Sequence, residues 1–329
     1  MRRRDFLGVF SGAAVAWPLA ARAQQEGAVE RVGVIGPSLA AGPGARASYP
    51  VLVDELRKFG FAEGRNLAVE YRPVDQGVPR AFAGVNELVA WKADVLLAFG
   101  PELALQAAVA ARPPIPIVIL AINYDPIALG YVQSLARPGG NVTGIVSRAL
   151  EVTAKQIELL VEAFPDRKRL GVLWDVQSAD QLSAAEREAK ARQLTLRALK
   201  LENPPYDFAP AFRGLAQDGV QMLLFASSPH FGRHNAEIAR LAIAHRLPCI
   251  FILKHYVQVG GLMSYGVDFV SMMRRAASFT AKILRGAKPA DLPVEQTTHF
   301  EFVVNLKTAR AMGVTLPTSI LLRADEVIE

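Results

Sequence analysis

Short apolar runs alternate along this chain with longer segments whose apolar residues recur every three or four positions. A short run between turn residues is typical of a buried strand, and the longer repeat is typical of a helix that buries one face. The strand pattern occurs first at residues 31–36, 67–71, 94–99 and 117–120, and the helix pattern occurs between and after these runs at 49–59, 81–91 and 102–111. Alternating strands and helices predict an α/β protein with parallel sheets covered by helices on both faces.

The same order of elements returns in the second half of the chain. RLGVLW at 169–174, MLLFAS at 222–227 and PCIFIL at 248–253 resemble RVGVIG at 31–36, VLLAFG at 95–100 and PIPIVIL at 114–120. The doubling predicts two similar, doubly wound lobes. The alternative is chance, because all parallel strands are rich in Val, Ile and Leu. A long helix is expected at 178–199, with Glu186–Lys190 and Glu188–Arg192 as i,i+4 pairs on a solvated face.

Glycine-rich stretches predict that the chain passes between the lobes more than once. ARPGGNVTGIV at 136–146 contains a turn and a short strand, and GGLMSYGVDF at 260–269 precedes a helix expected at 270–285. After PVEQ at 293–296, a strand and a short helix follow. We expect lobe 1 at 24–145 plus about 265–294, lobe 2 at 146–264 plus about 295–329, and a hinge of several crossing strands.

The N-terminal segment has the layout of a secretory signal peptide. Arg2, Arg3 and Arg4 precede sixteen uncharged residues, and an A-x-A sequence ends at Ala23. We expect cleavage near Ala23/Gln24 and a periplasmic mature protein. The alternative of a retained anchor needs about 20 apolar residues, whereas this run is shorter and contains Pro18. The arginines also resemble a twin-arginine export signal, with an ordinary Sec signal as the alternative.

Composition narrows the classes of function. Residues 1–23 hold four arginines and one aspartate, so the remaining 306 residues carry 33 basic and 30 acidic residues, a formal charge of +3 against +6 for the whole chain. No basic stripe remains, and we expect no nucleic-acid partner. The sole cysteine, Cys249, lies in an apolar run, which predicts a buried core residue.

The sequence contains no arrangement that indicates catalysis. The glycines of Gly42-Pro43-Gly44 lie six residues beyond the first strand, which does not fit a dinucleotide-binding turn, and no P-loop or G-x-S-x-G motif occurs. His230 and His234 are not accompanied by further metal ligands. We therefore predict no enzyme activity, no cofactor and no metal site.

Loops that follow the strands are the candidates for a binding site, because ligands of open parallel sheets bind beyond the carboxyl ends of the strands. Helix N-termini at these ends favour anionic groups such as a carboxylate. The candidate ligand-binding residues are Ser38, Gly100, Pro101, Glu102, Asn123, Tyr124, Asp125, Ser147, Ser227, Ser228, Tyr265 and Asp268. Tyr124 or Tyr265 could form a flat apolar wall, and Asp125 or Asp268 could accept from an ammonium group.

Long stretches of the chain resemble exported substrate-binding proteins of ABC importers, in the group typified by tryptophan- and tyrosine-binding members. The resemblance is strongest in RRRDFL…WPLAARAQQ, SLARPGGNVTGIV at 134–146, SYGVDF with RRAASFTAKILRGAKPADLPVEQ at 264–296, and FEFVVNLKTARAMGVTLPTSILLRADEVIE at 300–329. It implies the venus-flytrap fold of type I periplasmic binding proteins, a ligand between the lobes, and delivery to a membrane permease driven by a separate ATPase. It also implies a monomer.

Two positions depart from this family. Members often have Gly-Thr or Gly-Ser where this chain has Gly100-Pro101-Glu102, so a hydroxyl that could bind a ligand carboxylate is missing and an acid stands nearby. Many members have Thr-Asp-Pro where this chain has Tyr124-Asp125-Pro126. The predicted ligand is an amino acid or another small carboxylate, aromatic ones included.

Other functions share this fold. A sensing subunit that presents its ligand to a membrane receptor would have the same lobes and the same leader. An exported doubly wound enzyme would need a nucleotide loop or a nucleophile with its base. A repressor core would need DNA-binding helices where this chain has its leader.

Overall fold

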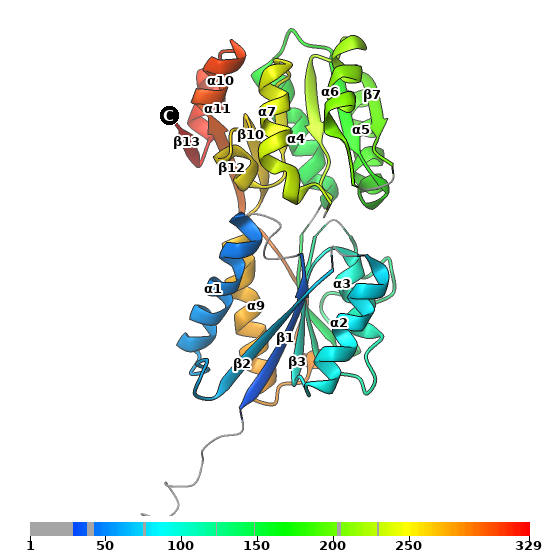
Figure 1. Ribbon diagram of the computed structural model, residues 1–329, viewed down its shortest axis with the longest axis vertical. Helices are drawn as coiled ribbons and strands as arrows, with labels where there is room; N and C mark the ends of the chain where they lie inside the picture. Colours follow the sequence, from blue (N-terminus) through cyan, green and yellow to red (C-terminus); the bar gives the residue numbers. More distant parts are fainter. Residues whose placement is uncertain are drawn as a thin grey trace, which may run out of the picture.

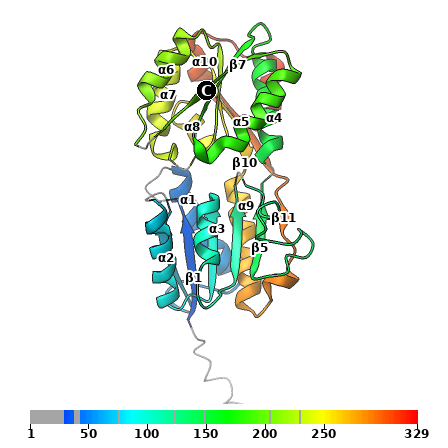
Figure 2. The ribbon, with the colours of Figure 1, turned by 90° about the vertical axis from the view of Figure 1, so that its right-hand side faces the viewer.

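The computed structural model describes residues 29–37, 43–74, 77–122, 124–147, 149–202, 205–228 and 230–329. Two lobes are stacked along the long axis of the molecule, and each lobe has a central sheet with helices on both faces (Figures 1 and 2). The predicted leader at residues 1–23 lies outside the described residues. The two-lobe α/β fold expected from the repeated strand–helix order is confirmed.

The sheet of the first lobe is entirely parallel. Its order is β11 (Glu295–Gln296), β5 (Val142–Val146), β4 (Ile117–Ala121), β3 (Val95–Gly100), β1 (Glu30–Gly36) and β2 (Leu67–Pro73). Each central strand is buried on both sides, as the unbroken apolar runs predict.

Helices cover both faces of this first sheet. Helices α1 (Pro43–Lys58) and α9 (Phe269–Leu284) pack on each other and on one face, where Val34 and Leu97 join their core. Helices α2 (Val78–Ala90) and α3 (Glu102–Val109) cover the opposite face, where Ile35 and Leu96 point. Neighbouring residues of one strand thus supply two separate cores, as the two-residue period of a strand requires.

The second sheet repeats the strand order of the first. Its order is β13 (Glu326–Ile328), β12 (Phe300–Asn305), β10 (Met263–Val267), β9 (Cys249–Phe251), β8 (Met222–Phe225), β6 (Arg169–Trp174) and β7 (Thr195–Lys200). Numbered within each lobe, the five strands β6 to β10 have the order fifth, fourth, third, first, second, which is also the order of β1 to β5. The resemblance between the two halves of the sequence is therefore a resemblance in topology.

The helices of the second lobe follow the same scheme. They are α4 (Ala149–Ala163), α5 (Ala179–Ala191), α6 (Phe208–Gln217), α7 (Asn235–Ala244), α8 (Lys254–Gln258), α10 (Leu306–Met312) and α11 (Thr318–Arg323). The described residues also form the short 3-10 helices η3 (Val176–Ser178), η4 (Gly232–His234) and η5 (Pro289–Asp291). Helix α4 packs against α5, and α6 packs against α7. Cys249 is fully buried in the core of this lobe, as predicted.

The chain passes from one sheet to the other three times. It does so between β5 and α4, between β10 and α9, and between β11 and β12. Residues 269–296 are thereby added to the first lobe, whereas β12 and the C-terminal elements belong to the second (Figure 2).

One strand pair departs from the expected parallel arrangement. Strands β10 and β12 are antiparallel, with Tyr265 opposite Phe302. The reason is topological: β10 ends where the chain leaves the second lobe, and β12 begins where it returns, so the two strands run in opposite directions.

The prediction of one long helix at 178–199 is wrong. Helix α5 ends at Ala191, Gln193 has φ of +55°, and β7 pairs in parallel with β6 from Arg169–Thr195 to Trp174–Lys200. The residues of this segment are good helix formers, but pairing with the edge of the sheet outweighs their helix propensity. Of the two expected charge pairs, Glu188 and Arg192 approach to 3.3 Å.

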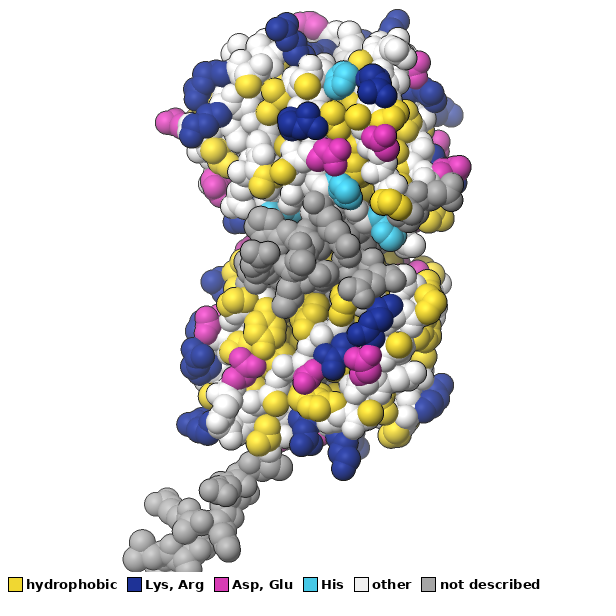
Figure 3. All heavy atoms as spheres, in the orientation of Figure 1, with side chains coloured by type: hydrophobic (Ala, Val, Ile, Leu, Met, Phe, Trp, Pro, Cys, Tyr) yellow, Lys and Arg dark blue, Asp and Glu magenta, His cyan; other side chains and the backbone are white. Residues whose placement is uncertain are grey.

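Acidic and basic side chains are interspersed on the face of the molecule in Figure 3. Within the described part of the chain, no helix combines the length and apolar character needed to cross a bilayer.

Candidate functional site

A cleft of about 470 Å³ lies between the two lobes, at the carboxyl ends of the strands of both sheets. The first lobe lines it with Pro37, Phe99, Gly100, Pro101, Glu102, Ile122, Tyr124, Asp125, Ala128, Leu129 and Phe269, and the second lobe lines it with Val176, Gln177, Asp180, Ser227, Ser228, Gly232, Leu253, His255 and Tyr256. This position agrees with the rule for ligands of open α/β sheets. The volume suits a small organic molecule.

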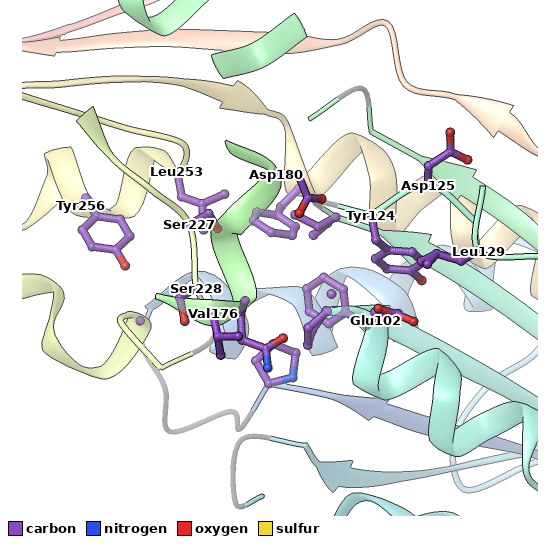
Figure 4. Close-up of a pocket in the computed structure, with 18 of the residues that line it drawn as sticks. Glu102, Tyr124, Asp125, Leu129, Val176, Asp180, Ser227, Ser228, Leu253 and Tyr256 are labelled. Atoms are coloured by element: carbon purple, nitrogen blue, oxygen red, sulfur yellow. The ribbon is translucent and has the colours of Figure 1, made fainter. Parts of the chain in front are cut away.

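The wall from the first lobe is mainly aromatic and apolar. Phe99 at the end of β3 meets Phe269 edge to face, with ring centroids 5.5 Å apart. Tyr124 is 8% exposed, and burial raises the pKa of its hydroxyl. Figure 4 shows Tyr124 and Leu129 on the same side of the cleft. This wall presents a preformed apolar surface to a ligand.

The Gly100-Pro101-Glu102 step turns the chain from β3 into α3. Gly100 has φ of +94°, which favours glycine, and a Cβ there would lie 3.2 Å from the ring of Pro37. Pro101 is the N-cap residue, and no side chain caps this helix. Glu102 is in the first turn, where the helix dipole favours an acid.

Glu102 is held in place by its neighbours. Its Oε1 accepts hydrogen bonds from the Tyr131 hydroxyl and from Gln106 Nε2, both at 2.8 Å. Burial, together with the bond to Glu102, raises the pKa of Tyr131 to about 12, so Tyr131 remains a donor at physiological pH. The carboxylate is therefore fixed at the edge of the cleft.

Asp125 is engaged with its own loop. Its Oδ1 accepts from the backbone N–H groups of Ile127 at 2.8 Å and Ala128 at 3.2 Å. This is the turn-forming use of an aspartate before a proline. In Figure 4 the Asp125 carboxylate points away from the residues of the second lobe.

The wall from the second lobe is organised around Asp175, a fully buried carboxylate behind the cleft surface. Asp175 accepts hydrogen bonds from Ser228 Oγ at 2.5 Å, Tyr206 Oη at 3.1 Å, Ser178 Oγ at 3.1 Å and Gln177 N at 3.0 Å. These bonds satisfy a charge that would otherwise be costly to bury. The network joins the loops after β6 and β8 to the loop before α6.

Ser227 and Ser228 follow β8 and lie on the cleft surface. The Ser227 backbone N–H donates to Gln181 Oε1 at 2.9 Å, and Gln181 Nε2 donates back to the Ser227 carbonyl at 3.2 Å. The Ser228 hydroxyl donates to Asp175 and accepts from the His230 N–H at 3.2 Å. The Ser227–Ser228 loop is thus fixed by hydrogen bonds within the lobe.

His255 and Tyr256 lie at the start of α8 and stack on each other, with ring centroids 4.7 Å apart. Burial lowers the pKa of His255 to about 4, so the ring is neutral at physiological pH. His255 Nε2 is buried, and the described part of the molecule supplies it with no hydrogen-bond partner.

The predicted candidates separate into three groups. The structure brings Gly100, Pro101, Glu102, Tyr124, Asp125, Ser227 and Ser228 together in the lining of the cleft. Ser38 and Asn123 lie outside the described residues. Ser147, Tyr265 and Asp268 are described but are not among the lining residues.

These last three residues have structural surroundings of their own. Ser147 is buried beside the first crossing, and Tyr265 stacks on Phe300 with ring centroids 5.8 Å apart. Asp268 caps α9, with Oδ1 accepting from the N–H groups of Val270 and Ser271. Burial alone would raise the pKa of Asp268, but the hydrogen bonds from Ser271 and Val270 outweigh burial and lower it.

The sequence reasoning missed part of the second wall. Val176, Gln177 and Asp180 follow β6, and the pair His255–Tyr256 follows β9. Both strands were expected, so applying the strand-end rule to every strand would have identified these loops.

The described residues contain no group of three or more His, Cys, Asp or Glu side chains that could hold a metal ion. His234 instead precedes α7 and approaches Glu237 at 3.1 Å, and His230 packs edge to face on Tyr206.

Comparison with known proteins identifies relatives over most of the chain. A tyrosine-binding protein of Clostridioides difficile (strain R20291) is 25% identical over 263 residues, which are 79% of this chain and 74% of that protein. A conserved domain protein from Vibrio cholerae O1 biovar El Tor is 25% identical, with a TM-score of 0.82 over 91% of this chain and 99% of that chain.

A third relative has a similar fold at slightly lower identity. The structure of an ABC domain from Streptococcus pneumoniae in complex with L-Trp is 24% identical, with a TM-score of 0.81 over 91% of this chain and 99% of that chain. The family model for "ABC transporter substrate binding protein" matches residues 32–328, almost all of the described chain. Members of that family are solute-binding proteins and not enzymes, and the chain belongs to the ABC transporter substrate binding protein family.

Proposed function

We propose that this chain is an exported solute-binding protein that captures a small molecule between its lobes and delivers it to an ABC importer. The proposed ligand is an amino acid or another small carboxylate, aromatic ones included. The observation that carries the proposal is the cleft itself, to which both lobes contribute loops at the carboxyl ends of their strands. The tyrosine-binding and L-Trp-bound relatives support an aromatic amino acid as the first ligand to test.

The proposed mechanism is closure of the two lobes around the ligand. A ligand that touches both walls stabilises the closed form by its higher affinity for that form. The three crossings of the chain between the sheets act as the hinge. The permease, driven by its separate ATPase, recognises the closed form.

The proposed site of action is the periplasm. Members of this family are typically extracytoplasmic, and residues 1–23 have the layout of an export signal cleaved near Ala23/Gln24. The mature chain is proposed to act as a monomer that diffuses between the outer and inner membranes.

Thermal unfolding of residues 24–329 with a panel of small metabolites tests binding. The panel spans amino acids, aromatic carboxylates, sugars, nucleosides and short peptides, and the protein is first unfolded and refolded to remove bound ligand. A ligand at a hundred times its Kd stabilises the folded state by about 2.7 kcal/mol. A rise in Tm with one chemical class supports the proposal. No rise with any class, and no small molecule released from freshly purified protein, would contradict it.

Uptake measurements separate import from sensing. Cells that lack the gene should take up the identified ligand poorly at low external concentration, and the restored gene should recover uptake. Unchanged uptake together with a lost transcriptional response to the ligand would favour the sensing subunit.

A further inference from the structure

We infer that the cleft selects its ligand by an ammonium group attached to an apolar body, and that a carboxylate on the ligand is not needed for binding. This inference rests on the proposed function and specifies the ligand class of the same site. It follows from the charges of the lining side chains, from the acceptors that three sets of backbone N–H groups already have, and from one buried polar atom of the lining to which the described residues supply no partner.

The charged side chains of the described lining all have the same sign. They are Glu102 from the first lobe and Asp180 from α5 of the second lobe, together with Asp125 in the loop after β4, whose carboxylate points away from the second lobe. None of the lining side chains that the structure describes is a lysine or an arginine. A cation bound between the lobes would lie near carboxylates from both of them, and an anion would be repelled by both.

Three sets of backbone N–H donors near the cleft already have carboxylates of the protein as acceptors. Asp175 accepts from the Gln177 N–H at the start of η3, Asp268 caps α9, and Asp125 accepts from two N–H groups of its loop. Free N–H groups of this kind form anion sites at helix starts. In this chain three such starts or turns near the cleft have internal acceptors.

The hydroxyl and amide groups of the Ser227–Ser228 loop are committed in the same way. The Ser228 hydroxyl donates its proton to Asp175, and the Ser227 N–H donates to Gln181. At the α3 start, Pro101 has no hydroxyl to donate, and Glu102 places a carboxylate in the first turn. The N–H groups of the α3 start have no side-chain cap, but the Glu102 carboxylate in the same turn would repel a ligand carboxylate.

His255 gives the independent indication that a ligand completes this cleft. His255 belongs to the lining and is only 9% exposed, and the described residues supply its buried Nε2 with no hydrogen-bond partner. An unpaired buried polar atom is costly. The ring is neutral because burial lowers its pKa to about 4. It therefore suits an uncharged polar group on the ligand, such as a hydroxyl or a ring N–H, and supplies no charge for a carboxylate.

Three matched compounds test the inference directly by calorimetry on the refolded mature protein. Tyramine has the phenol and the ammonium group, L-tyrosine adds the carboxylate, and 3-(4-hydroxyphenyl)propanoate has the carboxylate alone. We expect tyramine to bind at least tenfold more tightly than the propanoate, and within about tenfold of L-tyrosine. Titrations of each compound up to the millimolar range define the weakest binding that can be measured.

Charge-neutral variants test which carboxylates act. Glu102→Gln and Asp180→Asn should each weaken tyramine at least threefold and leave the propanoate unchanged or bound more tightly. Glu186→Gln is the matched control, because Glu186 is an exposed acid on the same helix as Asp180 and is not part of the lining. Circular dichroism and Tm of each variant show that the lobes remain folded.

The remaining outcomes distinguish this inference from the proposed function. Propanoate binding as tight as tyramine binding overturns the charge selection and leaves ligand capture intact. Binding of none of the three compounds also overturns the inference. In that case a small molecule released from freshly purified protein and identified by mass spectrometry would still support the proposed function.

Discussion

The two walls of the cleft differ, although the sheets behind them have the same strand order. The wall from the first lobe consists mainly of rings and aliphatic side chains around Phe99, Tyr124 and Phe269. The wall from the second lobe is carried by a buried hydrogen-bond network around Asp175, with serines and a neutral histidine at its surface. One topology thus provides shape complementarity on one side and polar positioning on the other, because the loops and not the strands decide the surface.

Removing the aromatic support of the first wall should have the largest effect. Phe99 is 3% exposed, so Phe99→Ala should lower the free energy of unfolding by about 4 kcal/mol, through lost burial and the cavity left behind. Urea unfolding followed by circular dichroism measures this change. Phe99→Leu, which keeps most of the volume, should cost about 1 kcal/mol. Equal losses for the two variants would show that the ring does not support the wall.

Removing Asp175, the centre of the hydrogen-bond network in the second wall, should lower the free energy of unfolding slightly less. Asp175→Ala leaves Ser228, Tyr206 and Gln177 without their acceptor, and we expect a loss of about 3 kcal/mol in the free energy of unfolding. Asp175→Asn should cost about 1 kcal/mol, because the hydroxyl donors can turn to accept from the amide. Glu186→Ala, on an exposed face of α5, is the control. A loss below 1 kcal/mol for Asp175→Ala would mean that water replaces the carboxylate.

The buried histidine of the second wall should make the protein sensitive to acid. The unfolded chain protonates His255 below a pH of about 6.5, whereas the folded protein keeps the ring neutral down to a pH of about 4. Stability contributed by the neutral ring is therefore present above this window and is lost as the pH falls through it. We expect this residue to account for a loss of roughly 2 to 3 kcal/mol.

Comparing variants across this pH range isolates the histidine. His255→Gln should remove that part of the pH dependence, as measured by urea unfolding at a series of pH values. His245→Gln keeps His255 and should keep the wild-type loss. An unchanged slope in His255→Gln would indicate that the ring is protonated in the folded state.

Much of the fold could be predicted because buried parallel strands appear in the sequence as short apolar runs. Segments such as 95–100 and 170–173 are buried on both faces and form continuous apolar runs, and the repeated order of such runs appears as the repeated topology. The strand at 195–200 could not be distinguished from the end of a helix. It lies at a sheet edge, its residues are good helix formers, and only pairing with β6 decides its conformation.

The candidate site was predictable only where a strand end determines it. Gly100-Pro101-Glu102 and Ser227-Ser228 follow recognisable strands, and both lie on the cleft. Asp268 also follows a strand, yet its carboxylate caps the next helix, and the sequence alone does not separate a capping aspartate from one that binds a ligand. The role of Asp175 could not be predicted for another reason, because its partners Tyr206 and Ser228 are 31 and 53 residues away in the sequence.

The burial of Cys249 has a practical consequence for observing closure. This sole cysteine is fully buried, its Sγ lies 3.1 Å from the Leu247 carbonyl oxygen, and burial raises the pKa of its thiol, so it reacts poorly in the folded protein. A cysteine introduced at Val176, which is 69% exposed at the cleft, would be the accessible thiol. One fluorophore attached there, with the native cysteine left in place, would turn the protein into an optical reporter of its own ligand.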